Sequence, residues 1–138
     1  MSGAPTERKL QEFVRWLWYW APPLLLMVVI FSLSAQPSLP KAPGPWLDTL
    51  LKKLTHVGVY LLLFLLLVRA WGRGRIGGTT LDASLVTTIA YGLSDEWHQS
   101  FVPGRHANWY DVVIDATVPL LLWLIWRLRR RWLLGTRD

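Results

Sequence analysis

Cysteine is absent from the sequence, and acidic residues and histidines are few. Without cysteine the chain has no disulfide framework, no thiol nucleophile and no thiolate metal site. Nine Asp and Glu stand against fifteen Lys and Arg, which leaves a net charge of +6. A basic excess can indicate nucleic acid binding, but most of these cations follow or precede apolar segments. Because that position is typical of membrane topology, no nucleic acid partner is expected.

Charge is also missing from four long stretches of the chain. These stretches are residues 22–35, 57–68, 83–94 and 116–126. None of them shows the sustained two-residue alternation of a membrane β-barrel. Lipid leaves only helices and closed barrels able to satisfy their backbone hydrogen bonds. The pattern therefore predicts an all-α membrane protein with four transmembrane helices, and we expect residues 1–138 to form one domain.

The expected spans follow from these stretches and their flanks. They lie near residues 13–34, 54–71, 81–98 and 109–127, and a basic tail follows at residues 127–138. About 20 residues cross a ~30 Å hydrocarbon core. Pro22 and Pro23 should kink the first span. This span is longer than the apolar region of a signal peptide, so we interpret it as a retained span and not as a cleaved signal.

The third span is the most polar of the four. Ser84, Thr87, Thr88 and Ser94 occur along it, so it should face protein rather than lipid. Asp82 lies near its start, where a carboxylate complements the helix dipole. We interpret Asp82 as a structural residue.

The distribution of cations predicts the orientation in the membrane. Four spans place both termini on one side, which receives eleven of the fifteen Lys and Arg residues: Arg8, Lys9, Arg15, Arg69, Arg73, Arg75, Arg127, Arg129, Arg130, Arg131 and Arg137. The other side receives Lys41, Lys52, Lys53 and Arg105. By the positive-inside rule both termini are cytoplasmic. The connection between the third and fourth spans then faces outward, near the outer leaflet.

Residues 91–115 form a charged segment between two apolar ones. The segment holds four of the nine carboxylates, two of the three histidines, and Arg105. Ionisable residues within a membrane are costly and by default suggest a site. The alternative is a set of solvated helix ends and a polar loop. We predict a polar, outward-facing cup at the turn between the third and fourth helices.

Helical spacing predicts which side chains of this segment meet. Asp95, His98 and Gln99 are spaced i, i+3 and i+4, which puts them on one face of the third helix. Asp111 and Asp115 occupy the first two turns of the fourth helix, where the dipole favours anions. The bend at Pro103 and Gly104 should bring these groups together. From the second helix, His56 and Tyr60 can reach the same cup.

Three functions compete for this cup. In a structural clamp, Arg105 pairs with Glu96 or Asp111. In a recognition site, polar side chains of the cup bind an anionic headgroup. These side chains are Arg105, Gln99, Asp111, Tyr60, His98 and His106. In an enzyme, Glu96 or Asp115 acts as a general base, and His56 or His98 acts as an acid or as a metal ligand. No H-E-x-x-H or similar spacing occurs, so neither a metal nor another cofactor is expected.

An ordered set of short motifs runs through the last three spans: H-x-x-x-Y at 56–60, E-x-x-Q at 96–99, F-V-P-G-R at 101–105, then Asp111. This combination resembles the VanZ-like family of small multi-pass bacterial membrane proteins. Two positions depart from that family. Asp115 stands where the family usually has Asn, and Val118 or Pro119 stands where Gly is expected.

The resemblance implies a place in the bacterial inner membrane, with membrane lipids as partners. The namesake of the family confers low-level resistance to the glycopeptide antibiotic teicoplanin, and the family brings no agreed enzyme activity. We therefore expect an envelope-related protein that recognises a lipid-linked or cell-wall precursor, or a glycopeptide, at the outer leaflet. The alternatives are a membrane-embedded hydrolase or transferase acting on a lipid-linked substrate, and a structural accessory subunit. The oligomeric state is left open.

Overall fold

The computed structural model describes residues 5–37, 40, 42–105 and 108–135. These residues form four α-helices, and no strand occurs within the described ranges. The helices are α1 (Pro5–Ser34), α2 (Pro45–Gly72), α3 (Gly78–Gln99) and α4 (Trp109–Gly135). The prediction of an all-α chain with four helices is confirmed. Every helix extends beyond its predicted span, most of all α2, which begins at Pro45, and α4 includes most of the basic tail.

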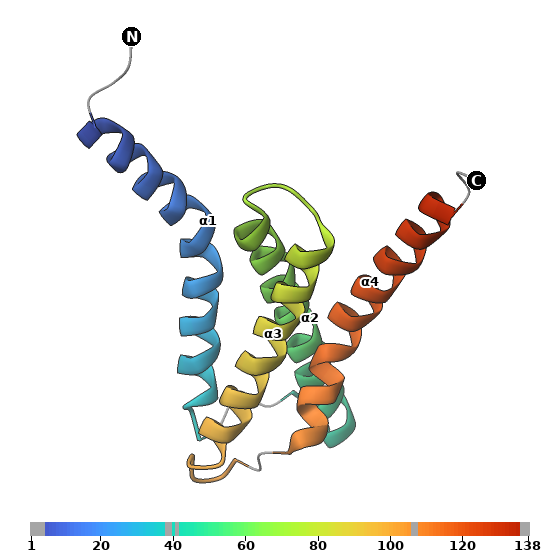
Figure 1. Cartoon of the computed structure of the whole chain (residues 1–138). Coiled ribbons are helices and arrows are strands. Elements are labelled where there is room, and N and C mark those ends of the chain that lie inside the picture. Colours follow the sequence, from blue (N-terminus) through green and yellow to red (C-terminus); the bar gives the residue numbers. More distant parts are fainter. Residues whose placement is uncertain (1–4, 38–39, 41, 106–107, 136–138) are drawn as a thin grey trace.

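The helices run alternately up and down (Figure 1). One end of the bundle, which we call the terminal end, holds the start of α1, the α2–α3 loop and the end of α4. The α1–α2 linker and the α3–α4 turn lie together at the opposite end, the turn end. Among the described residues α2 and α3 each contact the other three helices, whereas α1 and α4 flank them on either side.

Local sequence explains several of the helix boundaries and bends. Pro22 and Pro23 lie inside α1, and this helix changes direction along its length (Figure 1), because proline removes a backbone hydrogen bond and crowds the preceding turn. Pro45 begins α2, and Arg73 ends it in the left-handed conformation. In the turn after α3, Gly104 has a φ of 83°, a conformation that glycine adopts without strain.

The core has two apolar clusters around α2. One joins α1 to α2 through Ile30, Tyr60, Leu63 and Leu67. The other joins α2 to α3 and α4. Its buried members are Phe64, Val68, Leu81 and Leu85, and Trp123 and Trp126 pack against them. These clusters hold α2 in the centre of the bundle, where it presents His56 and Tyr60 to its neighbours.

The polar face of α3 points inward. Its buried residues include Ser84, Thr88, Asp95 and Gln99, which confirms that this helix turns its polar side toward protein. Ser84 and Thr88 bond to carbonyls one turn earlier in the helix, so their hydroxyls add no unsatisfied group to the core. Asp95 and Gln99, nearer the turn end, bond instead to other helices.

Two helices of the described chain are long and apolar enough to cross a membrane. They are Thr6–Ser34 and Pro45–Gly72, and most of the residues in their apolar windows are not buried within the protein. Large apolar side chains are exposed on all four helices, for example Val28, Leu62, Val86 and Val113. Contiguous apolar surface of this kind indicates contact with lipid or with another protein.

Candidate functional site at the turn end

A polar pocket of about 600 Å³ lies at the turn end, and α2, α3, α4 and the α3–α4 turn line it. Its charged lining carries both signs. The cations are Lys52, Lys53 and Arg105, the carboxylates are Asp48, Glu96, Asp111 and Asp115, and His56 stands between them. A pocket with this lining suits a ligand that has both anionic and hydrogen-bonding groups.

An apolar pocket of about 350 Å³ lies between α1 and α2. Ile30 and Leu33 of α1 face Leu51 and Val59 of α2 across it. Every predicted site residue that the structure describes, except His98, lines one pocket or the other.

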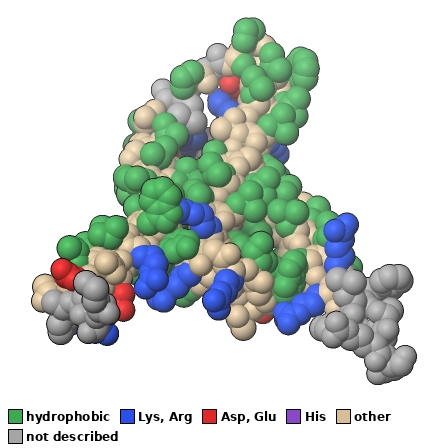
Figure 2. Space-filling view, turned by 90° about the horizontal axis from the view of Figure 1, so that it is seen from above, with side chains coloured by type: hydrophobic (Ala, Val, Ile, Leu, Met, Phe, Trp, Pro, Cys, Tyr) green, Lys and Arg blue, Asp and Glu red, His purple; other side chains and the backbone are tan. Residues whose placement is uncertain are grey.

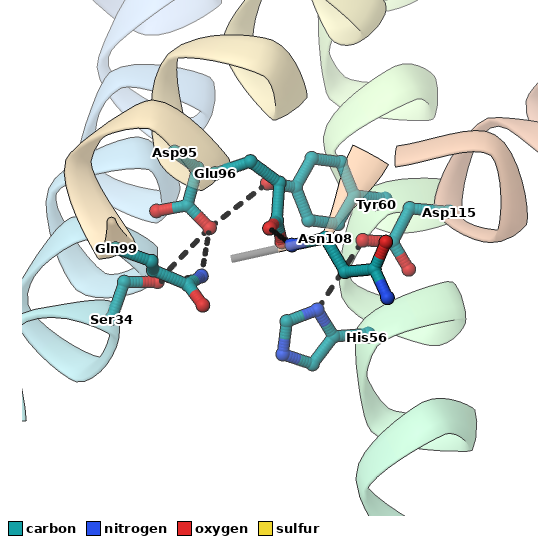
Figure 3. A network of polar contacts seen from close by, with 8 residues as sticks. All are labelled: Ser34, His56, Tyr60, Asp95, Glu96, Gln99, Asn108 and Asp115. Carbon is teal, nitrogen blue, oxygen red and sulfur yellow. Dashed lines mark hydrogen bonds and ion pairs between the residues drawn. The ribbon is translucent and has the colours of Figure 1, made fainter. Parts of the chain in front are cut away.

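Asp95 lies behind these pockets as the acceptor for three donors (Figure 3). Its Oδ2 accepts hydrogen bonds from the hydroxyl of Ser34 at 3.0 Å, the hydroxyl of Tyr60 at 3.2 Å and the amide of Gln99 at 2.9 Å. Asp95 is 3% exposed. Because the donors come from α1, α2 and α3, a single carboxylate fixes the positions of side chains from three helices.

The other oxygen of Asp95, Oδ1, is buried and has no hydrogen-bond partner in the described part of the chain. A buried carboxylate normally has a cation or several donors around both oxygens. The sequence placed Asp95 beside Gln99 but did not identify it or Ser34 as site residues. Ser34 lies 61 positions earlier, and no spacing rule connects residues so far apart.

His56 and Asp115 form a pair between α2 and α4 (Figure 3). His56 Nδ1 lies 3.3 Å from Asp115 Oδ2. Asp115 is 4% exposed, whereas about a third of the His56 side chain is exposed. A buried carboxylate on one ring nitrogen orients the imidazole and leaves Nε2 for other partners. Two of the three predicted catalytic residues are therefore in contact, and both line the polar pocket.

Glu96 connects the end of α3 to the start of α4. Its Oε2 accepts a hydrogen bond of 2.7 Å from the backbone N–H of Asn108 (Figure 3). Asp111 lies in the first turn of α4, where its backbone N–H donates to the carbonyl of Asn108. Both carboxylates line the polar pocket, so the pocket wall and the closure of the turn share the same residues.

Arg105 has partners other than those predicted for the clamp. Its Nε donates to the carbonyl of Gln36 at 3.0 Å, and its Nη2 donates to the carbonyl of Leu33 at 3.2 Å. No ion pair joins it to Glu96, to Asp111 or to any other carboxylate in the described ranges. Arg105 instead caps the carbonyl end of α1, where a cation complements the helix dipole.

His98 lies away from both pockets. Its ring stacks on Phe31 of α1, with 4.1 Å between the ring centroids. Its Nε2 is buried and has no partner in the described part of the chain. Near it, the Tyr91 hydroxyl donates to the carbonyl of Met27 at 2.6 Å, so this face of α3 packs against α1. His106 lies outside the described residues.

The potential metal ligands of the site do not form a cluster in the described part of the chain. Within the described ranges no group of three or more His, Asp or Glu side chains is placed to hold a metal ion. The acids, bases and hydrogen-bond donors of the site fall into three groups. These are the His56–Asp115 pair, the Asp95 network and the cations of the polar pocket.

Comparison with known proteins gives one match. The family model described as VanZ/LLP1 matches residues 18–130. This range covers nearly the whole chain, including all of α2 and α3 and all of the pocket residues named above. No curated protein matches the chain, and no solved structure matches it.

Proposed function

The chain belongs to the VanZ/LLP1 family, and from this premise we propose that it is a four-span protein of the bacterial inner membrane that recognises a lipid-linked or cell-wall precursor at the outer leaflet. The observation that carries the proposal is the polar pocket of mixed charge at the turn end. In a chain whose exterior is largely apolar, such a pocket is where a polar headgroup would be bound.

The lengths of α3 and α4 support four spans. At 1.5 Å per residue, the 22 residues of α3 extend about 33 Å and the 27 residues of α4 about 40 Å. Each length suffices for a ~30 Å hydrocarbon core. Exposed apolar residues occur on both helices, including Val86 on α3 and Leu121 on α4. The polar residues on the inward sides of α3 and α4 face α1 and α2, so these residues are not in contact with lipid.

The cations support an orientation with the terminal end in the cytoplasm. Viewed onto the terminal end, the surface carries several Lys and Arg side chains (Figure 2). Exposed cations near this end include Arg73, Arg75 and Arg127. An excess of cations on one side of the spans marks the cytoplasmic side, and the polar pocket then opens toward the outer leaflet.

Cysteine labelling in whole cells tests this orientation, because the chain has no natural cysteine. Ser100→Cys lies in the turn after α3, and Arg75→Cys lies in the α2–α3 loop; both positions are exposed. We expect a membrane-impermeant maleimide to label Ser100→Cys in intact cells, and Arg75→Cys only after permeabilisation. The reverse pattern would place the pocket in the cytoplasm, and labelling of both in intact cells would exclude four spans.

Headgroup recognition depends on the charges of the pocket. Lys53 is exposed to the pocket and has no hydrogen bond or ion pair with the described residues, whereas Lys52 is held by Asp48 at 2.6 Å. An ammonium group without a protein partner is suited to a phosphate oxygen. Asp111 on the opposite wall can accept hydrogen bonds from hydroxyl or ammonium groups of the same ligand.

Binding of dodecyl phosphate to the protein in phosphatidylcholine nanodiscs tests this recognition. We expect Lys53→Gln to weaken binding about tenfold, the effect of losing one charge-assisted contact of ~1.4 kcal/mol. Arg75→Gln removes the same charge at the terminal end and serves as the matched control, with affinity unchanged. Equal affinities for the natural protein and both variants would contradict recognition in the polar pocket.

The His56–Asp115 pair favours a second candidate function, a hydrolase or transferase acting on a lipid-linked substrate. A half-exposed imidazole oriented by a buried carboxylate can take a proton from water or a substrate hydroxyl through Nε2. Turnover of a lipid phosphate ester by purified protein, lost in His56→Gln, would establish this function. Binding without turnover would leave recognition as the function.

A further inference from the structure

The apolar pocket and the polar pocket are adjacent and share part of their lining. Asp48, Lys52, His56 and Arg105 line both. On the far side of these four residues, the apolar pocket extends between Leu33 of α1 and Val59 of α2. A single molecule lying across the border would therefore have its polar part among charges and its other part among aliphatic side chains.

The hydroxyl groups of the apolar pocket are already used within the protein. Ser34 and Tyr60 both donate to Asp95 Oδ2, and Thr55 donates to the carbonyl of Leu51. A hydroxyl whose hydrogen is committed in this way offers a ligand little beyond a weak acceptor. Three lining residues of this pocket carry hydroxyls, but Asp95 accepts two of these hydrogens and the Leu51 carbonyl accepts the third. This part of the pocket wall is therefore effectively apolar.

We propose that the apolar pocket holds the hydrocarbon chain of the same molecule whose phosphate-bearing headgroup lies in the polar pocket. This inference rests on the proposed function and narrows the ligand to an amphiphile whose phosphate lies next to one alkyl or polyprenyl chain. The pocket lies between α1 and α2, the two helices most suited to span a membrane. A chain already dissolved in the outer leaflet can enter between them without crossing water.

The dimensions of the pocket select a lipid chain over a protein segment. Its volume of about 350 Å³ is at the lower end of the range for small-molecule sites. A helix with its side chains is about 10 Å across and would need a groove along the whole bundle. One alkyl chain fills a narrow apolar pocket and needs no hydrogen-bond partner there.

Fluorescence quenching by a brominated chain tests the position of that chain. Leu51→Cys, at the edge of the apolar pocket, is labelled with bimane. Leu50→Cys is the matched control, because Leu50 is the neighbouring residue, is similarly exposed and does not line the pocket. Both proteins are placed in phosphatidylcholine nanodiscs and titrated with dodecyl phosphate carrying bromine on its chain.

We expect quenching at Leu51→Cys to saturate at a low mole fraction, to exceed that at Leu50→Cys several-fold, and to be reversed by unbrominated dodecyl phosphate. At Leu50→Cys quenching should rise in proportion to the mole fraction, as for free lipid. Equal, unsaturable quenching at both positions, with dodecyl phosphate binding still sensitive to Lys53→Gln, would overturn the inference and leave the proposed function standing. If Lys53→Gln also has no effect on binding, the proposed function fails as well.

Discussion

The two ends of the bundle use similar residues in different ways. At the terminal end, Arg69 lies over the rings of Trp18 and Tyr19, Arg127 over Trp123 and Arg130 over Trp126, each cation about 5 Å from a ring centroid. At the turn end, polar side chains from all four helices are connected by hydrogen bonds, and Ser34, Asp95, Gln99 and Asp115 are buried.

This difference separates residues that mark a membrane boundary from residues that form a site. A cation over an aromatic ring at an interface needs only that ring, and many rotamers satisfy it. A buried carboxylate that receives three hydrogen bonds requires each partner at one position. Substitutions should therefore be tolerated at the terminal end and costly at the turn end.

The largest expected difference in stability between the two ends is that between the variants Asp95→Ala and Asp82→Ala. Asp95→Ala leaves the hydroxyls of Ser34 and Tyr60 without an acceptor and removes one of the two acceptors of the Gln99 amide. It should lower the free energy of unfolding by about 3 kcal/mol or more. Asp82, at the terminal end, accepts a hydrogen bond from Trp123 and pairs with Arg127 at 3.5 Å, with 42% of its side chain exposed. Its removal should cost about 1 kcal/mol or less.

Equilibrium unfolding in detergent measures both values. Asp95→Asn is the informative third variant, because its amide oxygen still accepts while the buried charge is gone, and we expect it within about 1 kcal/mol of the natural protein. Similar costs for Asp95→Ala and Asp82→Ala would remove the distinction between the two ends.

A smaller difference is expected between Arg105→Lys and Arg127→Lys. Arg105 bonds to two carbonyls of the α1 end through Nε and Nη2, and an ammonium group cannot reproduce that fork. We expect a loss of about 1–2 kcal/mol in thermal or chemical unfolding. Arg127 makes one long contact with a partly exposed carboxylate and lies over the Trp123 ring, interactions that an ammonium group can also make, so its replacement should have little effect. If Arg105→Lys left the stability unchanged, the guanidinium would not be what holds the turn to α1.

Asp115→Asn probes the pair that Asp115 forms with His56. The amide can still accept from the imidazole but no longer offers a negative charge, so we expect a stability change of about 1 kcal/mol or less. The ring nitrogen chemical shifts of His56 should nevertheless move, since its hydrogen-bonded partner has lost its charge. Unchanged shifts would mean that the 3.3 Å contact does not orient the imidazole.

The smallest expected effect is the difference in stability between the variants Gly92→Ala and Gly58→Ala. A methyl group at Gly92 would lie 3.3 Å from the ring of Tyr60, whereas one at Gly58 would meet nothing within 4 Å. Alanine adds about 1 kcal/mol of helix propensity at either site. We expect this gain in unfolding measurements on Gly58→Ala and little or none on Gly92→Ala. An equal gain at both would show that the Tyr60 ring yields freely.

The sequence was sufficient for the helices and for the neighbourhood of the site. Charge-free stretches with prolines and glycines between them identified four helices, and the short Pro103–Gly104 turn required Glu96 and Asp111 to come close. The end of α4 was missed because nothing after residue 127 breaks a helix until Gly135. A change from apolar to basic residues marks a membrane boundary, not a change of backbone conformation.

The partners of individual side chains were harder to predict. The clamp alternative paired Arg105 with a carboxylate, but Arg105 donates to the backbone carbonyls of Leu33 in α1 and of Gln36 just after it. Every helix end presents such carbonyls, and no sequence pattern reveals which cation will bind them. The spacing of Asp95 and Gln99 predicted their shared face, and the bond between them follows from it. Ser34 and the stacking of His98 on Phe31 depend on how α1 packs against α3, which local spacing does not determine.

A dipolar coupling between the phosphorus of bound dodecyl phosphate and the side-chain nitrogens of lysine would test most directly whether the ligand lies at the turn end. The protein is labelled with nitrogen-15 at lysine Nζ and examined in phosphatidylcholine bilayers by solid-state NMR. We predict a coupling that disappears in the Lys52→Gln/Lys53→Gln double variant and persists in Lys9→Gln, which removes an exposed lysine of α1 on the terminal side. Loss of the coupling in Lys9→Gln alone, or its absence from the natural protein, would contradict recognition of a lipid phosphate at the turn end.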